Sequence, residues 1–300
     1  MTAAPRVRRL GRIFGSEMGP DWMVSHAAYP APVLLQDRLR LFLVARDYDN
    51  RGQVGFIDLD QSDPLRVLGV SEQPCLTPGA LGAFDDRGIS IGCVHSQGGQ
   101  MRMYYMGWNK AADVPFRNAI GMAVSTDDGL NFQRAYEGPL IDRSRFDPYT
   151  ISYPFVLSNG DGWKMYYGTS RAGGADESKM DHILTSANSE DGIDWHPTGA
   201  VEVPLDVGEY GLSRPWVWTQ DGQMSIYYSI RLAEYTIGVS VQRDGAFQRV
   251  TDDLMGKSSD DWDGHASCYP ALIRAAGRTL LFYNGDGYGR TGVGVAEVIW

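Results

Sequence analysis

The sequence predicts an all-β fold, a five-bladed β-propeller in which four-stranded antiparallel blades fill the whole 300-residue chain. The first observation is a pattern that occurs five times, in which a proline, or a glycine in one copy, precedes Phe or Tyr by twelve residues. The anchor pairs are Pro30 and Phe42, Gly92 and Tyr104, Pro154 and Tyr166, Pro215 and Tyr227, and Pro270 and Phe282. Successive aromatic anchors lie 62, 62, 61 and 55 residues apart, a period typical of radial or stacked repeats. The 36 glycines and 15 prolines also favour many short strands joined by turns.

Each repeat predicts its strands in the same order. A short apolar run forms the first strand, at residues 30–35, 152–157, 214–218 and 269–273. A polar turn with hairpin residues follows, such as the GlnAspGly at 220–222. The second strand carries the aromatic anchor, at residues 40–44, 103–106, 164–168, 225–229 and 280–284. The third strand is expected at residues 52–57, 119–124, 182–187, 236–241 and 292–296.

Outer strands are expected to complete the blades. In three repeats a tight turn leads into a fourth strand, within residues 125–132, 189–195 and 243–247. The last repeat ends at Trp300 after three strands, so we expect residues 6–14 to supply its fourth strand and close the ring. Closure of this kind leaves no open sheet edge. Because the repeats fill the chain, residues 1–300 are predicted to form one domain.

The composition disfavours several classes of function. A formal net charge of −10 argues against nucleic acid and anionic membrane surfaces as partners. No run approaches about 18 apolar residues, and the basic start lacks the apolar segment of a secretory signal. Cys75, Cys93 and Cys268 are too widely spaced for a zinc motif or a disulfide framework. They are expected to be reduced thiols of a cytoplasmic protein, and no cofactor is predicted.

The propeller arrangement divides the loops between two faces. The entry to the first strand and the loop from the second to the third strand share one face, which we expect to carry the chemistry. The turns after the third strands lie on the other face and contain Asp127 and Asp191. These turns resemble the Asp-box turns of sialidase-type propellers, in which the Asp side chain satisfies turn amides. We therefore expect Asp127 and Asp191 to be structural.

Four carboxylates precede first strands on the functional face. Asp85, Asp147 and Asp263 each follow an aromatic residue, seven positions before the anchor. A recurring aromatic–Asp pair can cap each loop, whereas catalysis usually needs carboxylates in unlike environments. Glu209 stands one position nearer its anchor and breaks the repeat, which makes it the stronger candidate for a catalytic acid.

A fifth carboxylate, Asp47, follows the second strand of the first repeat. Arg46 and Arg51 flank it in sequence and would hold it ionised. Asp47 is therefore a candidate base or nucleophile, and the alternative is a salt-bridged loop residue.

The residues after the second strands differ from repeat to repeat, as an asymmetric binding pocket requires. The predicted substrate-binding residues in these loops are Arg46, Arg51, Trp108, Asn109, Arg171, Arg231 and Asp286. Strand entries and rim positions add His26, His182, Arg214, Tyr235, His265, Tyr269 and Tyr288. Arginines can fork onto hydroxyl, carboxylate or phosphate groups, and aromatic rings can stack on sugar faces. The histidines lack the spacing of metal ligands, so no metal site is predicted.

With these residues in place, the chain resembles the five-bladed propellers of glycoside hydrolase families 32, 43 and 130. The resemblance covers all five repeats and is carried by residues 82–88, 145–148, 209–215, 262–270 and 281–294. Those families place three carboxylates around a central funnel. The resemblance implies that Asp147, in the ArgPheAspPro segment, stabilises the transition state and that Glu209 is the general acid.

One departure from the families leaves the mechanism open. The segment HisAlaAlaTyrPro at 26–30 contains no acid where families 32 and 43 carry their nucleophile or base. Either Asp47 or Asp85 takes that role, or the hydrolytic mechanism is absent. Family 130 relatives are often phosphorylases, which use one carboxylic acid and basic residues for phosphate, and the Arg-rich rim fits that option.

The sequence therefore predicts a glycosidase-like enzyme that cleaves a glycosidic bond of a small glycoside or oligosaccharide in the central funnel. Glu209 would be the acid, and Asp47 or Asp85 the base or nucleophile. Asp147 and Asp263 would orient the substrate or tune its charge. The alternatives are a phosphorylase or transferase, and a non-hydrolytic binding or repurposed biosynthetic protein on the same scaffold.

Overall fold

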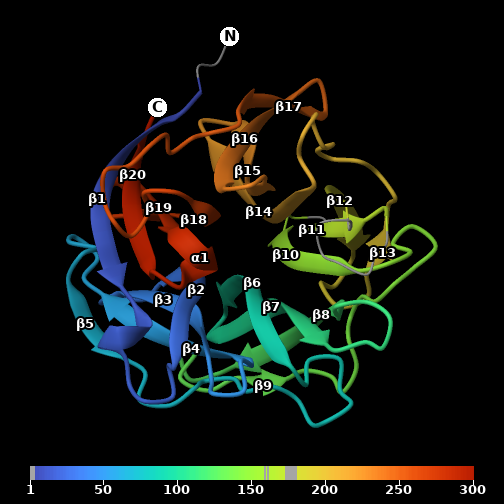
Figure 1. The fold of residues 1–300 in the computed structure, drawn as a ribbon, viewed down its shortest axis with the longest axis horizontal. Helices are drawn as coiled ribbons and strands as arrows, with labels where there is room; N and C mark the ends of the chain where they lie inside the picture. The colour runs from blue at the N-terminus through green and yellow to red at the C-terminus, as the bar shows by residue number, and fades with distance from the viewer. Residues whose placement is uncertain (1–3, 159, 161, 173–180) are drawn as a thin grey trace.

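The fold is all-β in the computed structural model, which describes residues 4–158, 160, 162–172 and 181–300 (Figure 1). The all-β prediction is confirmed. Besides strands, the described part contains a 3-10 turn η1 (Ser16–Met18) and the four-residue helix α1 (Asp286–Gly289). Within these ranges no helix is long and apolar enough to cross a membrane.

The strands of the described residues form one four-stranded sheet and two eight-stranded sheets. Each eight-stranded sheet consists of two antiparallel groups of four strands joined by a single parallel bridge, Gly52 to Gly88 in one sheet and His182 to Gly211 in the other. The first group is β2 (Ser25–Leu34), β3 (Leu39–Arg46), β4 (Gly52–Leu59) and β5 (Val67–Val70). The second is β6 (Gly88–Gln97), β7 (Gln100–Asn109), β8 (Arg117–Ser125) and β9 (Gln133–Arg134). The third is β10 (Ile151–Ser158), β11 (Trp163–Ser170), β12 (His182–Ser189) and β13 (His196–Pro197). The fourth is β14 (Gly211–Gln220), β15 (Gln223–Arg231), β16 (Tyr235–Arg243) and β17 (Ala246–Thr251).

The last group joins the two ends of the chain. It contains β18 (Cys268–Ala275), β19 (Arg278–Asn284), β20 (Val293–Ile299) and β1 (Arg6–Phe14). β1 runs antiparallel to β20, from Arg6 opposite Ile299 to Phe14 opposite Val293. The expected pairing of residues 6–14 with the last strand is therefore observed.

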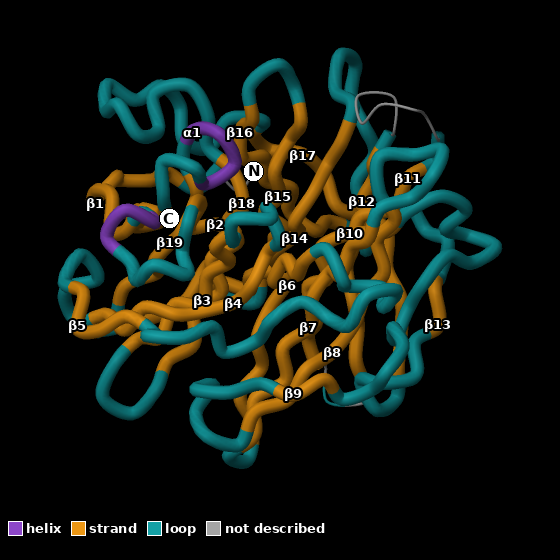
Figure 2. Tube along the Cα trace, turned by 60° about the horizontal axis from the view of Figure 1, so that its bottom comes forward, coloured by secondary structure: helices purple, strands orange, loops and turns teal. Residues whose placement is uncertain are grey.

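The groups surround a common centre, with β2, β6, β10, β14 and β18 innermost (Figure 1). Consecutive first strands contact one another around the ring, and β18 contacts β2. Loops and turns extend outward beyond the strands at both ends, as the tilted view shows (Figure 2).

Two of the expected outer strands are wrong in position. Residues 126–132 and 190–195 form turns, and the pairing residues of β9 and β13 follow them. The cause is side-chain bonding within the turns, where Asp127 accepts from the Asn131 amide at 3.0 Å and Asp191 from the Ile193 amide at 2.8 Å. The structural roles expected for Asp127 and Asp191 are confirmed.

Each first strand shifts its register beside its anchor. Tyr29, Tyr153, Arg214 and Tyr269 directly precede the prolines and have left-handed backbones, with φ from 41° to 57°. A non-glycine residue in this region costs roughly 1–2 kcal/mol, so surrounding contacts must hold it there. The four side chains converge near the axis, where they build the floor of the site.

Packing explains the residue types found at the anchor positions. The aromatic anchors are at most 2% exposed, which makes them the core of each group; they are Phe42, Tyr104, Tyr166, Tyr227 and Phe282. Glycine replaces proline at Gly92 because a Cβ atom there would collide with the Pro154 carbonyl.

Candidate functional site

The buried Arg214 guanidinium ties the inner strands together below the site. It is 0% exposed and donates only to backbone carbonyls, namely Ile91 at 3.1 Å, Tyr269 at 3.3 Å, Pro270 at 3.4 Å, Pro30 at 2.6 Å and Gly92 at 3.2 Å. Burial lowers the pKa of Arg214 to about 10, so the group remains charged at neutral pH. Five carbonyl acceptors replace the carboxylate that a buried cation usually requires.

Three tyrosines from three first strands lie together above this guanidinium. The ring of Tyr29 lies 4.5 Å from that of Tyr269 and 5.3 Å from that of Tyr153, measured between centroids. The Tyr153 hydroxyl donates to the Tyr29 hydroxyl at 3.3 Å. Burial raises the pKa of Tyr269 well above its usual value, so its hydroxyl stays protonated. These rings form an aromatic floor.

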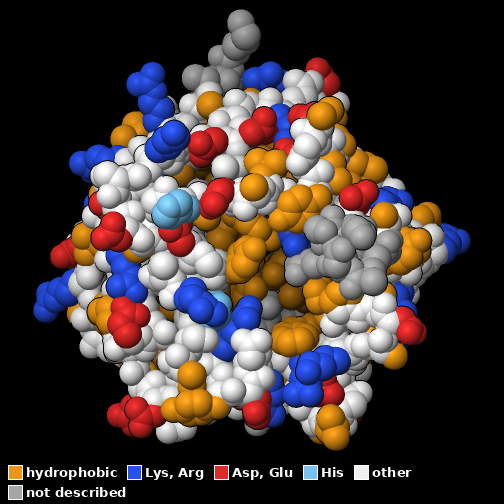
Figure 3. Space-filling view, in the orientation of Figure 1, with side chains coloured by type: hydrophobic (Ala, Val, Ile, Leu, Met, Phe, Trp, Pro, Cys, Tyr) orange, Lys and Arg blue, Asp and Glu red, His pale blue; other side chains and the backbone are white. Residues whose placement is uncertain are grey.

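A central pocket of about 500 Å³ opens over the tyrosine floor. In the space-filling view this face is hollowed near its centre, and blue and orange side chains gather there (Figure 3). The lining residues are basic, aromatic or small and polar; they are His26, Tyr29, Arg46, Phe116, Asn118, Ser152, Tyr153, His182, Ser213, Arg231, Tyr235, Tyr269, Gly287, Tyr288 and Arg290. No carboxylate is among them within the described part of the chain.

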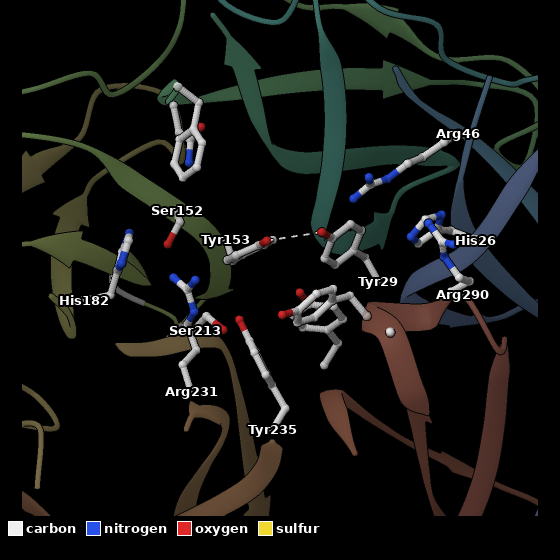
Figure 4. A pocket seen from close by; sticks show the side chains of 15 residues that line it. His26, Tyr29, Arg46, Ser152, Tyr153, His182, Ser213, Arg231, Tyr235 and Arg290 are labelled. Atoms are coloured by element: carbon white, nitrogen blue, oxygen red, sulfur yellow. Dashed lines mark hydrogen bonds between the residues drawn. The ribbon is translucent and has the colours of Figure 1, made fainter. Parts of the chain in front are cut away.

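Arg46, His26 and Arg290 meet at one side of the pocket, and we call them the cationic corner (Figure 4). Burial, and then the charges of Arg46 and Arg290, lower the pKa of His26 to about 4, so its imidazole is neutral at pH 7. His26 Nδ1 lies 2.9 Å from the Ser25 hydroxyl, and Arg46 donates to Asn50 at 2.9 Å. Two guanidinium groups therefore face a neutral ring, which is a favourable place for an anion.

His182 and Arg231 line the opposite side of the pocket (Figure 4). His182 Nε2 lies 3.2 Å from the Ser170 hydroxyl. The Arg231 guanidinium lies over two aromatic rings, 5.1 Å from the centroid of Tyr210 and 5.9 Å from that of Tyr235. Such stacking orients the guanidinium.

Three buried polar atoms of the lining lack hydrogen-bond partners among the described residues. They are Ser152 Oγ, Ser213 Oγ and Asn118 Oδ1, on side chains that belong to residues 2%, 4% and 7% exposed. A buried polar atom without a partner costs about 1–3 kcal/mol. Ordered water or ligand hydroxyls would satisfy all three, so this part of the lining suits polar groups.

A smaller side pocket of about 350 Å³ adjoins the central one. It lies between the first two strand groups and is lined by Trp108, which was predicted from the sequence to bind substrate. The two pockets share Tyr29, Arg46, Phe116, Asn118 and Tyr153.

The predicted binding residues divide into two sets. His26, Arg46, His182, Arg231, Tyr235, Tyr269 and Tyr288 line the central pocket, and Trp108 and Arg46 line the side pocket. The remaining ones do not line either pocket; these are Arg51, Asn109, Arg171, Arg214, His265 and Asp286.

Asp286 and His265 instead support the rim. Asp286 accepts from the backbone amides of His265 at 3.1 Å and Ala266 at 2.7 Å, and from His265 Nδ1 at 2.8 Å. The hydrogen bond and charge of Asp286 raise the pKa of His265. This network holds the start of α1, which carries Tyr288 and leads to Arg290 at the pocket.

None of the five predicted catalytic carboxylates is among the residues that line either pocket. Three of them form equivalent ion pairs, each with an arginine of the outer strand of its own group. Asp85 pairs with Arg134 of β9 at 2.7 Å and Asp263 with Arg9 of β1 at 2.9 Å. Glu209 pairs with Arg249 of β17 at 2.6 Å. Glu209 therefore follows the repeat in space, although it breaks the repeat in sequence.

The other predicted carboxylates also have internal partners. Asp147 accepts from the Tyr167 hydroxyl at 3.0 Å and the Ser144 hydroxyl at 2.8 Å. Asp47 pairs with Arg51 at 2.9 Å. These contacts support the loop-capping and salt-bridge interpretations that the sequence left open. Within the described residues no cluster of His, Cys, Asp and Glu could hold a metal ion.

The predicted binding set omits eight of the residues that line the central pocket, and the repeat contains a signal for half of these eight. Tyr29 and Tyr153 stand one position before the proline anchor, and Ser152 and Ser213 stand two positions before it. The others come from loops with no repeated pattern; they are Phe116, Asn118, Gly287 and Arg290.

Comparison with solved structures shows that the fold is similar to that of several glycoside hydrolases. The structure of a BT0996 RGII complex has a TM-score of 0.73 at 14% identity, covering 96% of this chain and 90% of that one. A thermostable family-43 glycoside hydrolase gives 0.66 at 14% identity, covering 91% and 88%. The Bombyx mori GH32 beta-fructofuranosidase BmSUC1 gives 0.65 at 17% identity, covering 99% and 61%. The resemblance to families 32 and 43 is thus confirmed at the level of the fold.

Relatives found by sequence are more similar to this chain than the solved structures are, and they define its family. No protein-family model matches the chain. It is 35% identical over 293 residues to "Uncharacterized protein Rv1502" of Mycobacterium tuberculosis H37Rv, covering 96% of this chain and 98% of the relative. The same identity and coverage hold for "Uncharacterized protein MT1551" of strain CDC 1551. The chain belongs to the family of these mycobacterial proteins.

Proposed function

We propose that this protein is a single-domain, five-bladed β-propeller, formed by residues 1–300, that takes an anionic carbohydrate as its substrate in the central pocket. The anionic group is a phosphate or a carboxylate, and it binds between Arg46 and Arg290. The groups of strands arranged around a centre support the propeller, and the glycoside hydrolase fold supports a carbohydrate ligand.

The cationic corner is the observation that carries this proposal. Arg46, His26 and Arg290 lie together at one side of the central pocket, so one anion bound there can contact both guanidinium groups (Figure 4). The unpartnered Ser152, Ser213 and Asn118 oxygens match a polyhydroxylated ligand. The tyrosine floor offers a ring face on which a sugar can lie.

Hydrolysis by the predicted carboxylates has less support than binding of an anion. Cleavage by two carboxyl groups requires both groups to reach the scissile bond. In glycosidases the two carboxyl groups lie about 5 to 9.5 Å apart. Glu209 and Asp85 are instead engaged by outer-strand arginines, away from the lining residues. We therefore place the proposed specificity in the basic residues of the pocket.

Isothermal titration calorimetry with a matched panel tests the proposal. We expect hexose 6-phosphates or hexuronates to bind and the corresponding neutral hexoses to bind much more weakly. Arg46→Gln should weaken the anionic ligand about 10- to 100-fold, because a hydrogen bond to a charged group contributes about 1.5–3 kcal/mol. Arg8→Gln is the control, since Arg8 lies in an exposed pair with Glu297. Equal affinity for neutral and anionic sugars, or no anionic binder in the panel, would contradict the proposal.

Phosphorolysis is a second candidate, favoured by the same two arginines. Inorganic phosphate would then be the anion, and one of its oxygens would attack the glycosidic carbon of a neutral glycoside. The glycosidic C–O bond would break, and the leaving alcohol would take up the proton of the hydrogen phosphate, giving a sugar 1-phosphate. In that case phosphate alone binds in the titration, and turnover of the glycoside depends on phosphate concentration. Turnover that is independent of phosphate would exclude this candidate.

A further inference from the structure

The side pocket is lined by fewer basic residues than the central pocket that it adjoins. Its walls include the apolar side chains of Val44, Ile89, Met106, Trp108 and Phe116. Among the described residues that line it, Arg46 is the only arginine and lies at the boundary that both pockets share, whereas the central pocket has Arg46, Arg231 and Arg290. One end of the combined cavity therefore concentrates the arginines, and the other combines apolar side chains with the polar side chains of Asn50, Ser90 and Asn118.

Trp108 gives the side pocket a stacking surface. Its indole is partly exposed and lies against the backbone of Gly88, where an added Cβ would be 2.6 Å from Nε1. Gly88 and Gly52 form the parallel bridge between the first two groups, so the indole rests on a rigid junction. A ring held in this way loses little entropy when a ligand stacks on it.

Asn118 connects the two pockets. It lines both, it is 7% exposed, and its Oδ1 has no hydrogen-bond partner among the described residues. A ligand that extends from the cationic corner into the side pocket must pass this acceptor. A hydroxyl or amide at the junction between two rings would satisfy it.

We propose that the side pocket is a second subsite, in which a ring attached to the anionic sugar stacks on Trp108. The ligand is then a two-ring glycoside rather than a monosaccharide. The ring is either a second sugar, which stacks through its C–H face, or an aromatic aglycone; both present an apolar face to the indole. This inference rests on the proposed binding of an anionic sugar in the central pocket.

The test compares one-ring and two-ring ligands that carry the same anionic group. Calorimetry is run with glucuronate as the parent, with 4-nitrophenyl glucuronide as the aromatic arm and with a glucuronosyl-glucose disaccharide, which also carries a single carboxylate, as the disaccharide arm. We expect at least one two-ring ligand to bind about tenfold more tightly than its parent, as aromatic stacking with burial allows. The arm that gains affinity identifies the kind of ring.

Trp108 variants assign the gain to the side pocket. Trp108→Ala should remove the tenfold gain and leave the affinity for the parent monosaccharide unchanged, which also shows that the variant is folded. Trp108→Phe should restore part of the gain because it restores a ring face. Trp300→Ala removes an indole at the exposed chain end and is the matched control.

The outcomes separate this inference from the proposed function. If monosaccharide anions bind and depend on Arg46, but the second ring adds nothing or its gain survives Trp108→Ala, the second subsite is overturned. If only two-ring ligands bind and Trp108→Ala abolishes their binding, the subsite is supported. If no ligand of either size binds, both the subsite and the proposed function are overturned.

Discussion

His26 is a neutral imidazole between two guanidinium groups, and this determines how the cationic corner responds to pH. Burial has the largest effect on its pKa, and Arg46 and Arg290 add to it. The same two arginines that repel a proton from His26 attract an anion. The corner thus has positive potential without a third positive charge at neutral pH.

The depressed pKa of His26 predicts a loss of stability in acid. The unfolded imidazole has a pKa of 6.5 and the native one about 4, so between these values the unfolded state binds a proton that the native state does not. Stability is therefore retained above about pH 6.5 and lost as the pH falls toward 4. Between pH 7.5 and pH 5, we expect the free energy of unfolding of the unaltered protein to fall by about 1–2 kcal/mol more than that of His26→Asn, after allowance for solvent screening.

Urea unfolding of the two proteins at pH 7.5 and pH 5 measures this difference. Asparagine tolerates the left-handed backbone of His26, which has φ of 66°. His196→Asn removes an exposed imidazole and is the control. An identical pH dependence in His26→Asn and the unaltered protein would contradict the prediction.

At the scale of elements, a recurring ion pair attaches the outer strand of a group to the loop that leads into the first strand of the same group. Arg134 also donates to the Thr77 carbonyl, Arg249 to that of Pro204 and Arg9 to that of Met255. Each arginine therefore joins a carboxylate and a loop carbonyl. Because the pairs recur in different groups, their role is to fix the loops rather than to contact one ligand.

Glu209→Gln is expected to lower stability and leave ligand affinity unchanged. The Glu209 side chain is 6% exposed and receives two hydrogen bonds from Arg249, of 2.6 and 2.7 Å. Neutralising it weakens charge-assisted bonds, at a cost of about 1–3 kcal/mol. Thermal unfolding and calorimetry measure the two effects.

The matched control uses the same arginine. Asp252 also pairs with Arg249, at 3.1 Å, but its side chain is 59% exposed, so Asp252→Asn should change little. Loss of turnover in Glu209→Gln without any change in melting temperature would restore Glu209 as the catalytic acid.

Across the whole molecule, one buried cation and one terminal strand connect the groups. Arg214 of β14 binds carbonyls of β2, β6 and β18, and β1 pairs with β20 at the end of the chain. The floor of the site therefore depends on strands that lie far apart in sequence. The pocket forms only when the whole set of groups is assembled.

Arg214→Met should destabilise the protein by about 3–5 kcal/mol, because it keeps much of the volume but leaves buried carbonyls without donors. Thermal denaturation should show a fall of several degrees in Tm. Arg274→Met, which removes an exposed arginine, should have little effect. An unchanged Tm in Arg214→Met would show that these carbonyl contacts add nothing to stability.

The strands, the aromatic core and the closure of the chain ends could be predicted from the amino-acid order, because they follow from local alternation and a repeated spacing. The same spacing located His26, Arg46 and Trp108 at pocket positions. The partners in the ion pairs could not be predicted in this way. Glu209 pairs with an arginine 40 residues away and Asp263 with one 254 residues away, and no local pattern encodes such contacts. The repeat therefore indicates where side chains can gather, whereas packing around the axis determines that basic groups, tyrosines and hydroxyls gather there.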